Sequence, residues 1–127
     1  MQLLKIPTML VRVCFVVNLI LGVAFWTGRL DAAQGLHILL GIVMVLSLFW
    51  LAVTNIQQKG SPVITVLAFV DGIALYVVGV GQANWLNGSA HWLIQVVHLL
   101  LAVLAIGFAE MISARLPQGS QTTPAAR

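Results

Sequence analysis

The sequence predicts an all-α membrane protein in which four transmembrane helices form an up-down bundle. Three observations support this prediction: the composition, the length of the apolar stretches and the shortness of the segments between them. Of 127 residues, 61% are hydrophobic and only 7% are charged, whereas a soluble domain carries about a quarter charged residues. So few charges cannot cover a water-facing surface. The composition argues against a soluble domain, a disordered chain and a nucleic-acid-binding protein, and the single cysteine argues against a disulfide scaffold.

Four apolar stretches are long enough to cross a lipid bilayer, which requires roughly 20 mostly apolar residues per helix. They cover about residues 8–27, 33–54, 62–82 and 89–113, within one domain that covers residues 1–116. The runs are continuous and lack the alternation of a β-barrel, and their short connections favour antiparallel neighbours. Residues 117–127 are rich in Pro, Gly, Ser, Thr and Gln, and they are predicted to form a disordered cytoplasmic tail.

The basic residues predict the orientation of the bundle. The side that carries both termini also carries most of the positive charge: Lys5, Arg12, Lys59, Arg115 and Arg127. The opposite side has Arg29 together with Asp31. Because cytoplasmic segments of membrane proteins are enriched in Lys and Arg, we expect both termini to be cytoplasmic, in a bacterial cytoplasmic membrane.

Histidines within the apolar stretches are the first candidates for function, because ionisable side chains are costly to place in lipid. His91 and His98 lie seven positions apart on the fourth predicted helix, so they project from one face. His37 lies near the start of the second helix, at a depth that matches that of His98. The second and fourth helices are parallel and lie on a diagonal of a simple bundle. We therefore expect His37 and His98 to face each other across the core.

Two histidines that face each other at one depth are the ligand set of a bis-histidine haem. Gly41 lies one turn from His37 on the same face and would leave room for a flat macrocycle. Candidate contacts for the haem propionates or for a redox partner lie near the same membrane face: His91, Gln95, Trp92 and Arg29. Two other interpretations stay open: hydrogen bonds between helices, and a metal site formed by His37, His91 and His98.

A resemblance to a known family rests on three short segments: His37-Ile38-Leu39-Leu40-Gly41, His91-Trp92 and His98-Leu99-Leu100-Leu101. These segments, which lie on two of the four predicted helices, resemble those of small bacterial four-helix membrane proteins of the cytochrome b561-like or integral haem-b type. The resemblance covers most of the chain by topology. It implies haem b with His37 and His98 as axial ligands, and one-electron transfer, often with quinol. Two-haem members use two histidine pairs, so the three histidines here imply at most one haem.

Asp71 lies about 14 Å beyond Pro62 at the rise of a helix, near the bilayer centre. It is expected to face the bundle interior and to be protonated or hydrogen-bonded, with Asn18 as its partner and Ser47 within reach. Two roles stay open for Asp71. It would act as a proton relay or as a proton acceptor for a quinone or quinol, or it would form a polar clasp between the first and third helices.

Arg12 and Glu110 lie near the cytoplasmic ends of the first and fourth helices. Those two helices are neighbours in a closed four-helix bundle. We therefore predict a structural ion pair between Arg12 and Glu110.

Three functions are compatible with these residues. The first is an integral membrane b-type haem protein, with one haem near the outer face, that transfers electrons or interacts with quinol. The second is a non-catalytic scaffold or accessory subunit in a homo- or hetero-oligomer, whose polar residues join helices. The third is a small proton pathway or transporter that uses Asp71. The sequence has no phosphate loop, nucleophile elbow or HExxH motif, so any enzymatic activity would be that of an oxidoreductase component.

Overall fold

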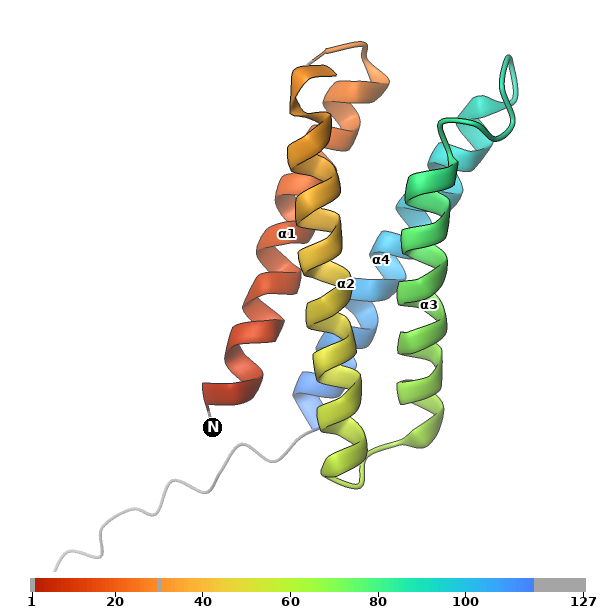
Figure 1. Cartoon of the computed structure of the whole chain (residues 1–127). Coiled ribbons are helices and arrows are strands. Elements are labelled where there is room, and N and C mark those ends of the chain that lie inside the picture. Colours follow the sequence, from red (N-terminus) through yellow and green to blue (C-terminus); the bar gives the residue numbers. More distant parts are fainter. Residues whose placement is uncertain (1, 30, 116–127) are drawn as a thin grey trace, which may run out of the picture.

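The computed structural model describes residues 2–29 and 31–115, which form four long helices with short connections (Figure 1). The helices are α1 (Gln2–Trp26), α2 (Gln34–Gln57), α3 (Pro62–Gly81) and α4 (His91–Arg115), and a short 3₁₀ turn, η1 (Asp31–Ala33), precedes α2. All four are long and apolar enough to cross a membrane. The predicted all-α bundle of four transmembrane helices is thereby confirmed. The predicted tail, 117–127, lies outside the described residues.

The turn between α2 and α3 is built around the buried side chain of Asn55. Its Nδ2 donates hydrogen bonds to the carbonyl oxygen of Ser61 at 2.9 Å and to Oγ1 of Thr65 at 2.8 Å. The backbone N–H of Gly60 donates to the carbonyl oxygen of Asn55 at 2.7 Å. Ser61 caps α3, since its Oγ accepts a hydrogen bond from the N–H of Ile64, and Pro62 follows at the first helical position, where it is favoured. The predicted start of the third span therefore matches the start of α3.

The helices alternate in direction, so the bundle has two different ends (Figure 1). At the two-loop end, residues 27–33 and 82–90 connect the helices; at the one-loop end, α1 begins, α4 ends and residues 58–61 connect α2 to α3. Each helix contacts its neighbours along the chain, and α1 contacts α4. In addition, α2 contacts α4 across the bundle. Thus α2 and α4 occupy the short diagonal of the bundle, and α1 and α3 occupy the long one.

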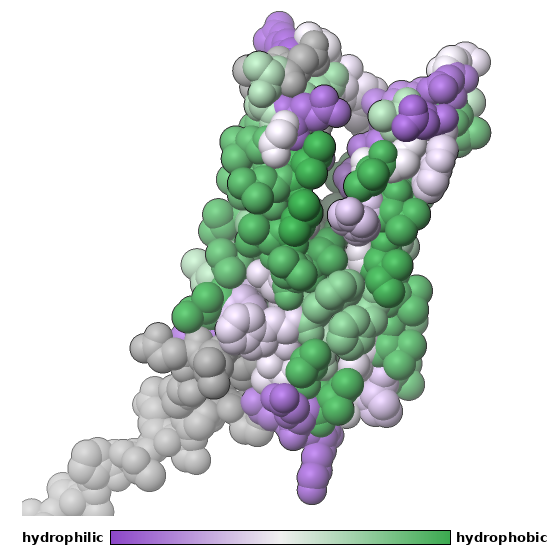
Figure 2. Space-filling view, in the orientation of Figure 1, coloured by the Kyte–Doolittle hydropathy of each residue, from purple (hydrophilic) through white to green (hydrophobic). Residues whose placement is uncertain are grey.

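Most of the apolar core lies in the half of the bundle nearer the one-loop end. It consists of Val11, Cys14, Met44, Val45, Leu48, Leu51, Ala52, Ile64, Ala68, Leu75, Ala105, Ala109 and Ile112. Nearer the two-loop end, Leu21 and Ile94 are the buried hydrophobic residues within the described ranges. Toward that end the α1–α2 pair and the α3–α4 pair diverge (Figure 1), and the surface between them is hollowed (Figure 2). The helices are therefore packed firmly at one end and loosely at the other.

The outer surface of the bundle is apolar over most of its length, as Figure 2 shows. Large hydrophobic side chains on every helix are about half exposed, among them Val16, Leu39, Val66 and Leu100. Polar residues gather at the two ends of the bundle instead (Figure 2). An apolar belt between polar ends fits a lipid bilayer as the surrounding solvent.

Gly72 allows α2 and α3 to pack closely. A Cβ at this position would lie 2.5 Å from Cε1 of Phe49, and the Phe49 ring packs on Phe69 with 5.0 Å between ring centres. We expect Gly72→Ala to lower the thermal unfolding midpoint in detergent, because overpacking costs about 1–3 kcal/mol. Gly107→Ala is the matched control, since a Cβ on Gly107 would meet nothing within 4 Å. Equal midpoints for the two variants would contradict the prediction.

Candidate functional site

His37 and His98 lie opposite each other in the two-loop half of the bundle, as the sequence predicts. His37 comes from the first turn of α2, and His98 lies two turns into α4. Their ring centres are 6.2 Å apart, and the ring planes are inclined by 53°. Both side chains are half-buried. The contact of α2 with α4 along the short diagonal brings the two imidazoles together.

Each imidazole packs against a neighbouring helix at a glycine. A Cβ on Gly22 of α1 would lie 4.0 Å from Cε1 of His37, and a Cβ on Gly79 of α3 would lie 2.9 Å from Cε1 of His98. The ring of Phe25 also meets the His37 ring edge-on, with 5.4 Å between centres. The Phe25 ring therefore packs on His37, and there is no room for a Cβ at Gly79 beside the His98 ring.

One nitrogen of the pair has no hydrogen-bond partner. Nδ1 of His98 is buried and bonds to no other described residue. Leaving such an atom unsatisfied costs about 1–3 kcal/mol, so it is available to a ligand. A coordinating metal is one such ligand, because imidazole nitrogens are common metal donors.

The spacing of the rings fits a shared metal ion. Two imidazoles on opposite sides of one metal have ring centres about 6 Å apart, since each metal–nitrogen bond is about 2 Å long. The observed separation of 6.2 Å corresponds to this value. By this distance, and by the uncommitted Nδ1 of His98, the residues present fit a metal ion held by two imidazoles, such as the iron of a haem. The loose packing of the two-loop half is compatible with a bulky group beside the rings.

Asn18 connects α1 to the part of α2 that carries His37. With its amide oriented to suit its neighbours, it donates a hydrogen bond to the carbonyl oxygen of His37 at 3.2 Å and accepts one from the N–H of Gly41 at 3.0 Å. A Cβ on Gly41 would lie 3.7 Å from the Asn18 amide. Gly41 therefore faces Asn18, and its predicted role in accommodating a macrocycle stays a prediction.

Asp71 does not contact Asn18, so the predicted clasp between α1 and α3 is wrong. The Asp71 side chain is buried, and neither carboxylate oxygen has a hydrogen-bond partner among the described residues. The physical reason is that α1 and α3 lie on the long diagonal of the bundle, so residues on these two helices are separated even at similar depth. Ser47 does not supply the missing bond, because its Oγ donates to the carbonyl oxygen of Val43 at 2.7 Å.

The other predicted residues of the two-loop end do not join the histidine pair. Nδ1 of His91 donates to the carbonyl oxygen of Trp85 at 3.4 Å, so His91 faces the loop of residues 82–90. The described residues contain no group of three or more His, Cys, Asp and Glu side chains suited to a metal ion. Among these residues, His91 is therefore not grouped with His37 and His98 as the three-histidine interpretation requires. Trp92 and Arg29 are exposed and Gln95 is half-buried, and their contacts with propionates stay predictions.

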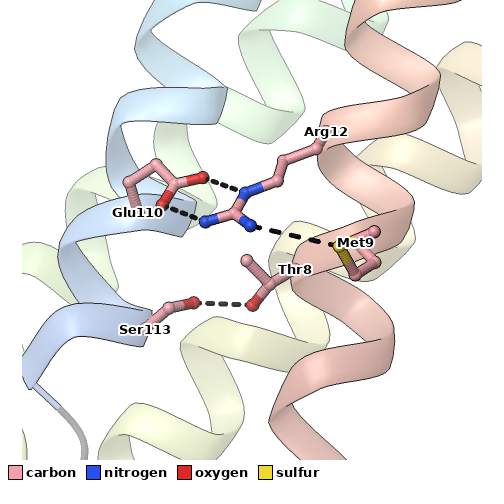
Figure 3. A network of polar contacts seen from close by, with 5 residues as sticks. All are labelled: Thr8, Met9, Arg12, Glu110 and Ser113. Atoms are coloured by element: carbon pink, nitrogen blue, oxygen red, sulfur yellow. Dashed lines mark hydrogen bonds and ion pairs between the residues drawn. The ribbon is translucent and has the colours of Figure 1, made fainter.

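The predicted ion pair between Arg12 and Glu110 is confirmed (Figure 3). Nε and Nη2 of Arg12 donate to the two carboxylate oxygens of Glu110 at 2.6 and 2.8 Å. One turn nearer the one-loop end, the hydroxyls of Thr8 and Ser113 share a hydrogen bond of 2.6 Å. These contacts fasten α1 to α4. The ion-paired side chains remain about half exposed, at 50% and 44%.

Exchange of the two charges tests the structural role of this ion pair. Arg12→Glu and Glu110→Arg, made singly, are expected to lower the unfolding midpoint by several degrees, because each places two like charges side by side. The double variant restores the attraction and most of the lost stability. The measurement is thermal unfolding in detergent. A double variant as unstable as the single ones would contradict the prediction.

The sequence did not predict which residues lie beside the two histidine rings. These residues are Gly22, Gly79 and Phe25, and no sequence motif marks them. A usable signal was present, because Gly22 lies one turn before the end of α1 and Gly79 lies near the end of α3, both at the depth of the histidines. Depth alone does not say which helix faces which, so these contacts require the structure.

Comparisons with family models, with curated proteins and with solved structures found no match for this chain. The site is characterised by three features: the facing pair of histidines, the buried Nδ1 of His98 without a hydrogen-bond partner among the described residues, and the loose packing of the two-loop half.

Proposed function

We propose that this chain is an integral membrane electron-transfer protein that holds one b-type haem between His37 and His98. The observation that supports it best is the facing pair of imidazoles, 6.2 Å apart between ring centres. The buried, uncommitted Nδ1 of His98 adds to it. Such a haem would supply reversible one-electron chemistry when bound.

The protein's own residues would hold and orient the group. His37 and His98 would hold the metal of the haem, and Asn18 would fix the segment of α2 from which His37 projects. Phe25 and Gly79 would limit rotation of the rings. Fixed ligands favour electron transfer, because a site that is already organised needs little rearrangement when its charge changes.

The two-loop end would be the side on which electrons are exchanged. Arg29 supplies a positive charge at this end. His91, Trp92 and Gln95 lie at the same end of the bundle, in the first turns of α4. These side chains suit contact with propionates and with a quinol or a redox partner protein. With one pair of histidines near one membrane face, the electron enters and leaves on that side.

We propose a bacterial cytoplasmic membrane with both termini in the cytoplasm. The supporting observation is the distribution of basic residues, since Lys5, Lys59 and Arg115 all lie toward the one-loop end. Cytoplasmic segments are enriched in such residues. The histidine pair would then lie nearer the outer face.

An absorption spectrum of the full chain tests the proposal. The protein is purified in detergent from haem-replete cells, and spectra are recorded after oxidation and after reduction. We expect a Soret band, a sharp b-type band on reduction and one haem for each chain. A colourless protein would overturn the proposal. A colourless protein that co-purifies with a stoichiometric partner would point to the scaffold function instead.

A further inference from the structure

Asp71 has no role in the electron-transfer site described above. It lies midway along α3 (Pro62–Gly81), and only 5% of its surface is exposed. Both carboxylate oxygens are buried, and neither has a hydrogen-bond partner among the described residues. A polar side chain buried this deeply normally has a hydrogen-bond partner. The bare carboxyl group of Asp71 therefore indicates a site for a ligand from outside the protein.

The helices packed against α3 bring no positive charge to Asp71. On α2, the single titratable side chain is His37, in the first turn of the helix. On α4 they are His91, His98, Glu110 and Arg115, of which Glu110 is paired with Arg12 of α1. The other titratable side chains of α1 are Lys5 and Cys14, and the other titratable side chain of α3 is Tyr76. An ionised carboxylate here would be an unpaired charge in the protein interior, the costliest state, whereas the protonated acid is neutral.

The surroundings of Asp71 suit a proton better than a metal ion or an organic ligand. Hard cations in proteins take six or more oxygen ligands, and the described residues hold no cluster of three or more His, Cys, Asp and Glu side chains. The groove between α2 and α3, lined by residues such as Phe49 and Tyr76, lies on the lipid-facing side and does not include Asp71. A proton needs neither a ligand cluster nor a cavity.

Asp71 is close enough to the histidine pair to respond to its charge. Gly79, against which the His98 ring packs, lies eight residues further along α3. This spacing corresponds to about 12 Å along the helix axis. The space between is protein interior and lipid, where charges are screened much less than in water.

We infer that Asp71 is a proton-binding site whose occupancy follows the oxidation state of the metal held by His37 and His98. This inference rests on the proposed function. The oxidised site carries one more positive charge than the reduced site, and that charge favours the ionised carboxylate. When a one-electron donor reduces the site, the extra positive charge is lost and one Asp71 oxygen takes up one proton from hydronium in the bulk solvent. An O–H bond of hydronium breaks, releasing water, and the O–H bond of the carboxylic acid forms, so the electron and the proton together leave the net charge of the protein unchanged.

The experiment uses infrared spectroscopy of the full chain. The sequence contains two aspartates, Asp31 and Asp71, so Asp31→Asn leaves Asp71 as the only one. This variant is made by cell-free synthesis with aspartate carrying ¹³C in its side-chain carboxyl. Before haem loading, we expect the C=O stretch of a neutral carboxylic acid at neutral pH, shifted by the label and by D₂O. After loading, we expect the same band to gain intensity in the reduced-minus-oxidised difference spectrum.

Each outcome separates the inference from the proposed function. A coloured protein without the labelled band in the difference spectrum overturns the inference and leaves the haem function intact. A labelled band at the position of an ionised carboxylate before loading also overturns it. A protein that binds no haem overturns the function and the inference together. Asp71→Asn should remove the band, and the isotope shift assigns the band even if that variant does not fold.

Discussion

Replacing either His37 or His98 with alanine is expected to abolish the bis-histidine haem spectrum, whereas replacing His91 is expected to preserve it. His37 and His98 supply the two facing imidazoles, and removal of one would leave the proposed haem with a single histidine ligand. His91 instead bonds to the carbonyl oxygen of Trp85. The measurement is the haem content and the oxidised and reduced spectra of each purified variant.

His91→Ala is the matched control, because it removes the same side chain from the same helix as His98→Ala. Helical circular dichroism and elution volume of each variant establish that the bundle still forms. Equal haem content in all three variants would show that the pigment is bound elsewhere. Loss of haem in His91→Ala alone would show that His37 and His98 are not the ligands.

Gly79→Ala is expected to weaken haem binding about 10- to 100-fold, the usual range for changes that disturb the orientation of a metal ligand. The added Cβ would lie 2.9 Å from Cε1 of His98, so the imidazole must turn or shift. The ring is the movable end of a side chain, so the helices themselves need not separate. Haem titration of the apoprotein measures the effect.

Gly107→Ala controls for the general effect of an alanine in place of a helical glycine, since its Cβ would have open space around it. We expect it to bind haem as the parent protein does. Wild-type affinity in Gly79→Ala, with an unchanged reduced spectrum, would show that His98 does not depend on this contact.

The four helices could be predicted from the sequence because their apolar runs match the thickness of a bilayer. The burial of individual residues could not. Leu48 is fully buried, whereas Leu46, two positions away on the same helix, is 60% exposed. Lipid and protein interior both accept leucine, so hydrophobicity does not separate the two faces. For the same reason, the concentration of the core in the half nearer the one-loop end required the structure.

Depth along the membrane was the informative quantity for the site. It predicted the pairing of His37 with His98, since the parallel helices α2 and α4 carry them to one level and contact each other. It also predicted the ion pair at the one-loop end. It failed for Asn18 and Asp71, because position around the bundle decides whether residues at similar depth meet. Nothing in the spacing of apolar residues placed α1 and α3 on the long diagonal.

The ion pair of Arg12 with Glu110 has a consequence for the order in which the protein is assembled. Its two residues are 98 positions apart in the chain, and Thr8 is 105 positions from Ser113. During synthesis, α1 enters the membrane well before Glu110 has been translated. An incomplete chain therefore carries an uncompensated cation in its first transmembrane segment, which is costly in lipid. Arrival of α4 neutralises that charge and joins α1 to α4, so the first helix acquires its partner only when the fourth is in place.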